Sequence, residues 1–454
     1  MAVPRLACRH FVLTPKTQFL NFAFSKGHVF NPTEAINELS RILPLLLVFL
    51  FIGCVDRDRS NPLDPKNPNT LGKPSGLQVV SRADSVFLTW DRLGLSDITG
   101  IQLYRKTESE NEFVPFALLP ADVTSFTDVP VAFGIEHSYQ ISAKGNEFES
   151  LRSDVVLVEP GPTFSWIADN ASQQLFKLTH DARHILATTF GFITALDIEP
   201  NPITGEAWVI DFVASVLGQV VKLTPDGQLS GPLVDLQGPR DAALHHETGD
   251  LWVGDVLDKS VIKIDGQNNN IVLRIPDFEI PSSLAVDQRD GSCWVADRGL
   301  QQVIKLSIDG ARSLNVSPTI SSVRWLDVDS NDGAVWVSDS TAILRLSTAG
   351  ELEFRVTPPA GFVYKLAVNQ RTGEFWVLNW SPSSVAKYLK TGEQLFKIDG
   401  FDEPEDLAVN SFDGSCLVAD TRNNRVVRIA SDGSDVRIVR EFRFPIAVGI
   451  QNEP

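Results

Sequence analysis

Positive charge is the first thing that this chain of 454 residues lacks, since 40 lysines and arginines stand against 57 acidic residues and give a formal net charge of −17. Proteins that bind nucleic acids gain most of their affinity by neutralising phosphates with basic side chains. The balance therefore argues against a nucleic-acid partner, and equally against electrostatic adsorption to anionic lipid. Four cysteines are also too few for a disulfide framework at this length.

Long hydrophobic runs are scarce as well. The longest is the uncharged stretch 42–53 (ILPLLLVFLFIG), which follows Arg41. A helix of that length spans roughly 18 Å, short of the roughly 30 Å of hydrocarbon in a bilayer, so it does not predict a transmembrane helix. A basic residue followed by a short apolar stretch that ends in a small residue is typical of a secretory signal.

The residues around Cys54 (Phe51-Ile-Gly-Cys54) resemble the bacterial lipobox. The resemblance implies that 1–53 is a leader with a lipoprotein signal peptide, and that an acylated Cys54 anchors the protein to a membrane of the bacterial cell envelope. Val55 rather than aspartate follows the cysteine, which favours the outer membrane. A plain cleaved signal or an uncleaved anchor stays possible. Residues 54–73 are rich in proline, asparagine and aspartate, and predict a flexible tether.

Alternating apolar residues, interrupted by turn residues every 8–12 positions, begin at about residue 74 and predict a small β-sandwich. Pro74, Trp90, Tyr104 and the stretch Tyr139–Ala143 resemble a fibronectin type III domain over 74–160. In a secreted bacterial protein this resemblance implies a spacer or docking module, and no catalytic motif is visible in it.

A repeated segment dominates the rest of the chain. Trp-Val-Ala-Asp and its variants recur seven times at spacings of 42, 44, 42, 42, 40 and 41 residues, beginning at Trp166, Trp208, Trp252, Trp294, Trp336, Trp376 and Leu417. Each period contains four short alternating segments joined by tight turns, which is typical of a propeller blade. The tryptophans are expected to fill the space between blades, and the aspartates to cap the following turns.

The repeats resemble the NHL family and predict a seven-bladed β-propeller over 161–454. The first repeat lacks its leading strand, and the last segment, Pro445–Ile450, is a leading strand without a successor. We therefore expect the C-terminal strand to complete the first blade and leave no open edge. The predicted fold class is all-β, a type III sandwich followed by a closed seven-bladed propeller.

Candidate binding residues lie where each innermost strand begins, because those positions share one face and differ between repeats. Two aromatic residues that depart from the repeat, Trp325 and Trp380, stand beside mixed charges and predict a ligand surface. Trp380 is expected in the turn that adjoins these positions. The alternative is an ordinary polar rim. The candidates are Arg240, Asp241, Arg324, Trp325, Tyr364, Lys365, Trp380, Glu405 and Asp406.

Catalytic signals are weak. Histidines of the propeller occur only in the first two repeats, and adjacent His245 and His246 point to opposite sides of a strand. Polar residues at the far ends of the inner strands are interpreted as turn caps rather than calcium ligands; they are Glu199, His245, Asp287, Asp329, Asn369, Asn410 and Gln451. We predict no metal and no cofactor.

The prediction for function is a non-enzymatic, membrane-anchored binding platform or scaffold for a protein, peptide or glycan. The alternative is a metal-dependent propeller lyase or lactone hydrolase, which would need three or more ligands around one point.

Overall fold

The computed structural model describes residues 60–82, 85–214, 217–316, 322–358, 362–439 and 442–452. The predicted leader and Cys54 lie outside these residues. Within the described ranges, no helix is long and apolar enough to cross a membrane.

The N-terminal region contains two antiparallel sheets. One joins β1 (Gln78–Arg82), β2 (Ser85–Thr89) and β5 (Ser125–Asp128), and the other has the order β4 (Val114–Pro120), β3 (Ile98–Thr107), β6 (His137–Gly145), β7 (Val156–Val158). Buried residues of both sheets, such as Leu88 and Ile141, belong to one apolar core, and Leu63 from the preceding turns packs against it. The two sheets thus enclose a single core, while membership of the type III family stays a prediction.

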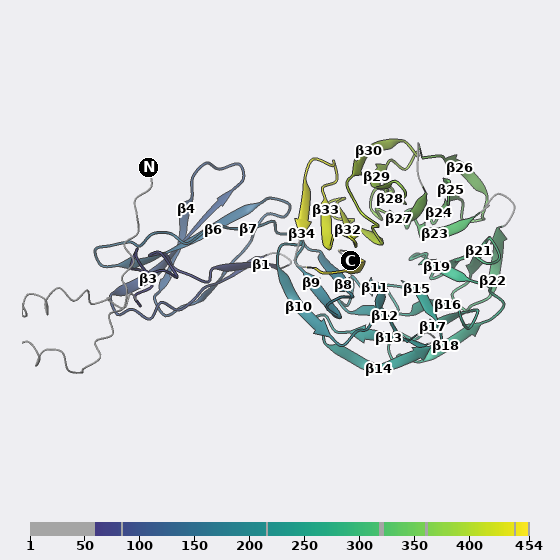
Figure 1. Cartoon of the computed structure of the whole chain (residues 1–454), viewed down its shortest axis with the longest axis horizontal. Coiled ribbons are helices and arrows are strands. Elements are labelled where there is room, and N and C mark those ends of the chain that lie inside the picture. The colour runs from purple at the N-terminus through teal and green to yellow at the C-terminus, as the bar shows by residue number, and fades with distance from the viewer. Residues whose placement is uncertain are drawn as a thin grey trace, which may run out of the picture. The chain divides into compact units, whose positions relative to one another are not determined.

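Seven four-stranded antiparallel sheets follow, arranged around a common axis (Figure 1). The innermost strands are β11 (Ala195–Pro200), β15 (Pro239–Leu244), β19 (Pro281–Val286), β23 (Val323–Val328), β27 (Val363–Val368), β31 (Asp406–Val409) and β35 (Pro445–Gln451). The second strands are β12 (Ala207–Ala214), β16 (Leu251–Asp255), β20 (Cys293–Asp297), β24 (Val335–Asp339), β28 (Phe375–Trp380), β32 (Cys416–Asp420) and β8 (Phe164–Asp169).

The two outer strands of every blade complete these sheets. The third strands are β13 (Leu217–Leu223), β17 (Ser260–Ile264), β21 (Gln302–Leu306), β25 (Ala342–Leu346), β29 (Ser383–Tyr388), β33 (Arg425–Ile429) and β9 (Gln174–Leu178). The outermost are β14 (Leu229–Leu236), β18 (Ile271–Ile275), β22 (Arg312–Val316), β26 (Leu352–Val356), β30 (Gln394–Asp399), β34 (Val436–Val439) and β10 (Ile185–Phe190). Below, a blade is named by its innermost strand, and the face on which the innermost strands begin is called the start face.

The ring is closed by the last strand. β35 pairs antiparallel with β8, with Val448 opposite Ile167, so the first and last parts of the propeller share one sheet. This confirms the predicted all-β fold and its closure by the C-terminal strand.

Contacts between blades explain why the tryptophans recur. Trp252 is fully buried and packs in one core cluster with Val286 and Val295 of the next blade. The ammonium of Lys263 lies 5.3 Å from the Trp252 ring and donates a hydrogen bond of 3.1 Å to the Ile308 carbonyl, also in the next blade. The tryptophan therefore has the structural role predicted from the sequence, and the basic residue that covers it adds a polar bond between blades.

Candidate functional site

A β-bulge near the start of the innermost strand interrupts six of the seven blade ladders. The residue just after the bulge occupies an equivalent position in every blade, opposite the same place on the second strand. Those seven residues are Asp197, Asp241, Ser283, Trp325, Lys365, Asp406 and Ala447. Bulges re-aim side chains, and here they bring residues far apart in the sequence around one central opening.

Several of these side chains bond to the next blade. The Asp197 carboxylate accepts a hydrogen bond of 2.9 Å from the Ala242 amide, and Asp241 accepts one of 2.6 Å from the Leu284 amide. In the same way the Leu326 amide donates to the Ser283 hydroxyl (3.3 Å), and the Val448 amide donates to the Asp406 carboxylate (2.8 Å). These polar residues therefore hold neighbouring innermost strands together. Trp325 and Lys365 depart from this arrangement.

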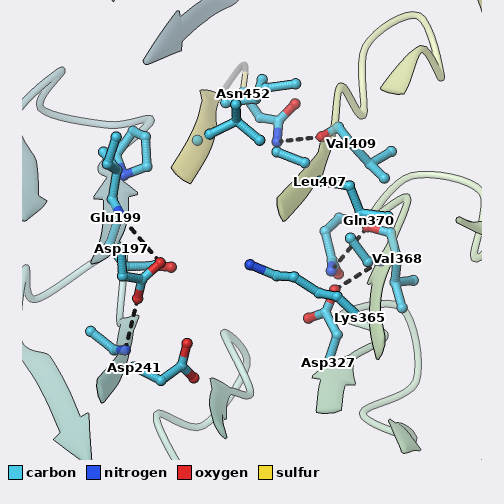
Figure 2. Close-up of a pocket in the computed structure, with 18 of the residues that line it drawn as sticks. Asp197, Glu199, Asp241, Asp327, Lys365, Val368, Gln370, Leu407, Val409 and Asn452 are labelled. Carbon is cyan, nitrogen blue, oxygen red and sulfur yellow. Dashed lines mark hydrogen bonds between the residues drawn. The ribbon is translucent and has the colours of Figure 1, made fainter. Parts of the chain in front are cut away.

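Lys365 is the one basic residue in the ring of bulge positions. Its side chain extends across the opening toward the carboxylates of Asp197 and Asp241 (Figure 2), and its ammonium forms an ion pair with Asp406. Burial alone would lower the pKa of Lys365, but the nearby carboxylates outweigh it and raise that pKa above its usual value. The lysine is therefore charged and already has a partner.

The central opening continues along the propeller axis and is called the tunnel below. The carboxyl groups that line it have raised pKa values. Burial, opposed only in part by Lys365, raises the pKa of Asp197 to about 6, and it also raises the pKa of Asp241 and of Asp406. Deeper in the tunnel, burial raises the pKa of Asp327 to about 7, although its carboxylate accepts a bond of 2.8 Å from the Val368 amide. Burial and neighbouring carboxylates raise the pKa of Glu199 well above its usual value.

Three adjoining cavities follow the axis. The cavity at the start face has a volume of about 250 Å³, and seven of the nine predicted residues line it: Arg240, Asp241, Trp325, Tyr364, Lys365, Glu405 and Asp406. A cavity of about 210 Å³ shares Asp241, Trp325 and Lys365 with it and also contacts Asp197, Glu199 and Asp327. The third, of about 390 Å³, opens beyond Glu199 and Asp327. The first cavity with its lining residues is called the start mouth below.

The other two predicted residues lie beside the start mouth. Trp380 stands at the end of β28, rather than in the turn where the sequence placed it, and its ring lies 4.8 Å from that of Tyr364. The Arg324 guanidinium covers the Phe362 ring at 4.6 Å. The prediction also treated Asp241 and Asp406 as surface groups, whereas they are only 2% and 3% exposed because their carboxylates bond to the next blade.

Sequence reasoning missed part of the tunnel. Asp197 and Asp327 were not identified, and Glu199 was assigned to the turn caps at the strand ends. The ladder places Asn201, not Glu199, at the capping position, where it accepts a bond of 2.9 Å from the Ile203 amide. Glu199 instead lies opposite Trp208, at the position that Ala243 occupies opposite Trp252. Aligning the inner strands on the repeated segment would have shown two acids, Glu199 and Asp327, at a position where four other blades carry alanine.

One other group could be considered for a metal. Ligand atoms of Glu159, His180 and Asp413 lie within 4.8 Å of one another. Arg428 contacts both carboxylates, at 3.4 and 2.5 Å, and Arg437 lies 3.5 Å from Glu159. Since these arginines supply the positive charge, the cluster is an internal ion-pair network.

Comparison with known proteins supports the fold. No protein-family profile and no curated protein matches the chain. A solved putative 6-phosphogluconolactonase from Bacteroides uniformis matches with a TM-score of 0.55 at 10% identity, over 63% of this chain and 99% of its own. A protein of unknown function from Desulfotomaculum acetoxidans gives 0.54 at 12%, over 63% and 98%. Virginiamycin B lyase from Staphylococcus aureus gives 0.46 at 12%, over 54% and 84%, too low a score to support an argument.

At such identities the likeness extends to the fold alone. The fold and the comparisons together define a β-propeller protein. The NHL resemblance stays a prediction, as does ligand binding by the nine predicted residues.

Proposed function

We propose that the propeller is a non-enzymatic binding module, and that a protein, peptide or glycan binds at the start mouth. The observation that carries this proposal is the gathering of Trp325 and Tyr364 with charges of both signs around one cavity, with the Trp380 ring packed 4.8 Å from that of Tyr364. Partly exposed aromatic rings beside polar groups at a concave opening are typical of ligand sites.

The polarity of the start mouth also favours binding. Tyr364 donates a hydrogen bond of 3.1 Å to Glu405, while Arg240 is exposed at the rim. The rings are thus held in place before a ligand arrives, which lowers the entropic cost of association. A metal-dependent lyase or lactone hydrolase gains less support, because the described histidine and carboxylate groups that approach one another closely are those neutralised by Arg428 and Arg437.

Alanine substitutions at the start mouth test the proposal. Full-length chain with Trp325→Ala or Tyr364→Ala should bind peptides from a display library, or sugars from a glycan array, at least about tenfold more weakly than the unaltered chain, because a central aromatic contact is lost. Ile308→Ala, at an exposed residue in a hairpin of the opposite face, is the control. Thermal melting shows whether each variant is folded. Unchanged binding of every ligand by both mouth variants would refute the proposal.

We further propose that the protein is anchored to the cell envelope through an acylated Cys54, the outer membrane being favoured. The support is the lipobox resemblance and the proline-rich segment that follows it. The unaltered chain should sediment with membranes and have the mass of a protein acylated at residue 54. The Cys54→Ser variant should lack the acyl mass and leave the membrane fraction. Equal membrane association of both chains would contradict this proposal.

A further inference from the structure

The start face carries an arc of exposed aliphatic and aromatic side chains. Six large apolar residues there have exposures between 40% and 54%. Each lies just before an innermost strand or in the hairpin between second and third strands, and both locations belong to the start face. They are Ile193, Leu217, Leu257, Ile280, Leu300 and Phe444, called the apolar crescent below.

Among the residues that the structure describes, the apolar crescent lies in four consecutive blades, those of β35, β11, β15 and β19. Five of the seven predicted residues that line the start mouth lie in the other three blades, and the remaining two, Arg240 and Asp241, lie in the β15 blade. Clusters of exposed apolar residues next to a polar pocket mark interaction sites, since their burial against a partner is favourable. The start face therefore has an apolar part and a charged opening side by side.

The opening has hydrogen-bond acceptors that the fold leaves unused. Asp241 is only 2% exposed and accepts the Leu284 amide with one oxygen, while its other oxygen has no hydrogen-bond partner among the described residues. Glu199, further along the tunnel, makes no hydrogen bond with any described residue. Lys365 forms its ion pair with Asp406, and its ammonium offsets the effect of burial on Asp241 and Glu199 only in part. Neither residue is among the fully buried polar groups that lack a partner, so these oxygens are open to the cavity, where a donor from outside can reach them.

We propose, building on the binding role above, that the ligand is a protein segment presenting a lysine or arginine flanked by apolar side chains. The basic group enters the start mouth toward Asp241, and the flanking residues cover the apolar crescent. The choice rests on charge complementarity with the tunnel carboxylates and the net charge of −17. A glycan would match the aromatic rings but leave the aliphatic residues of the crescent exposed.

Selection from a random peptide display library on the full-length chain tests the inference. Enriched peptides should contain lysine or arginine next to apolar residues. Fluorescence anisotropy of the best synthetic peptide should show at least about tenfold weaker binding to Asp241→Asn and to Leu300→Glu. The first variant removes charge complementarity, and the second removes an apolar contact. Asparagine at position 241 keeps an acceptor for the Leu284 amide, so Asp241→Asn should preserve the hydrogen bond between the two blades.

Ile308→Glu is the control, since Ile308 is 43% exposed in a hairpin on the opposite face, and its variant should bind as the unaltered chain does. Enrichment of acidic or uncharged peptides that still require Trp325 would overturn this inference while leaving the proposed function standing. An absence of enriched peptides together with glycan binding at the start mouth would also overturn this inference and leave the proposed function standing. Binding insensitive to all start-face variants would refute both.

Discussion

At the scale of single residues, Glu199 is the most informative group of the tunnel. It lies on an innermost strand at a position where the next two blades along the chain have Ala243 and Ala285, and it makes no hydrogen bond with a described residue. Its burial among Asp197 and Asp241 raises its pKa above the usual 4.5. A carboxyl placed in this way does not help the fold, because its ionised form is poorly solvated there.

The stability of the protein should therefore depend on this carboxyl and on pH. With a folded-state pKa above the unfolded value, the native state binds more protons between the two values, so stability falls as pH rises through that window. Asp197, with a pKa of about 6, and Asp327, with a pKa of about 7, act in the same direction. Glu199→Gln removes one such group without removing a hydrogen bond.

Glu199→Gln should raise the free energy of unfolding by about 1–3 kcal/mol at pH 8, and the gain should shrink toward zero as pH is lowered to about 4. Urea denaturation at a series of pH values measures this. The same exchange at Glu247, an exposed turn residue, should have little effect at either pH. A gain at Glu199 that is independent of pH would contradict the explanation.

At the scale of strands and turns, the repeated aspartate after each tryptophan does more than the sequence predicted. Asp255 caps the following turn by accepting the Asp258 amide at 2.9 Å, as expected. It also accepts the amides of Gln237 (2.9 Å) and Gly238 (2.8 Å), which lead into its own blade's innermost strand. One buried carboxylate thus fixes both connections on the start face.

Asp255→Ala should lower the free energy of unfolding by about 3–5 kcal/mol, since three backbone amides lose their acceptor in a buried place. Asp255→Asn should cost clearly less, because the asparagine side chain keeps one oxygen that accepts backbone amides. Chemical denaturation of both variants measures the difference. Equal losses would show that charge, not hydrogen bonding, is the main contribution.

The same elements show what a sequence can and cannot predict. The tryptophan spacing predicts the blades because one buried ring per blade interface is a packing requirement. The start-mouth residues were found because they differ between repeats. The inward direction of Asp197 was missed because it depends on the bulge in its innermost strand, and a bulge leaves no signal in the alternation of apolar and polar residues.

At the scale of the whole molecule, closure by the last strand joins two blades that are far apart in sequence. β35 pairs with β8 in the first blade, and it is also bonded to the β31 blade, where the Val448 amide donates to Asp406 (2.8 Å) and the Ser411 amide donates to Asn452 (2.7 Å). The C-terminal strand therefore belongs to the framework of the tunnel as well as to the ring.

Removal of residues 445–454 should open the propeller. β8 would then present an unpaired edge beside the tunnel, and exposed edges pair with other chains. The truncated chain is expected to form oligomers by light scattering, and the amides of β8 that bond to β35 should exchange with deuterium much faster than those of the distant strand β24. Removal of residues 453–454 alone is the control. A truncated chain that stays monomeric and keeps slow exchange in β8 would show that the other blade contacts, rather than this strand, hold the ring together.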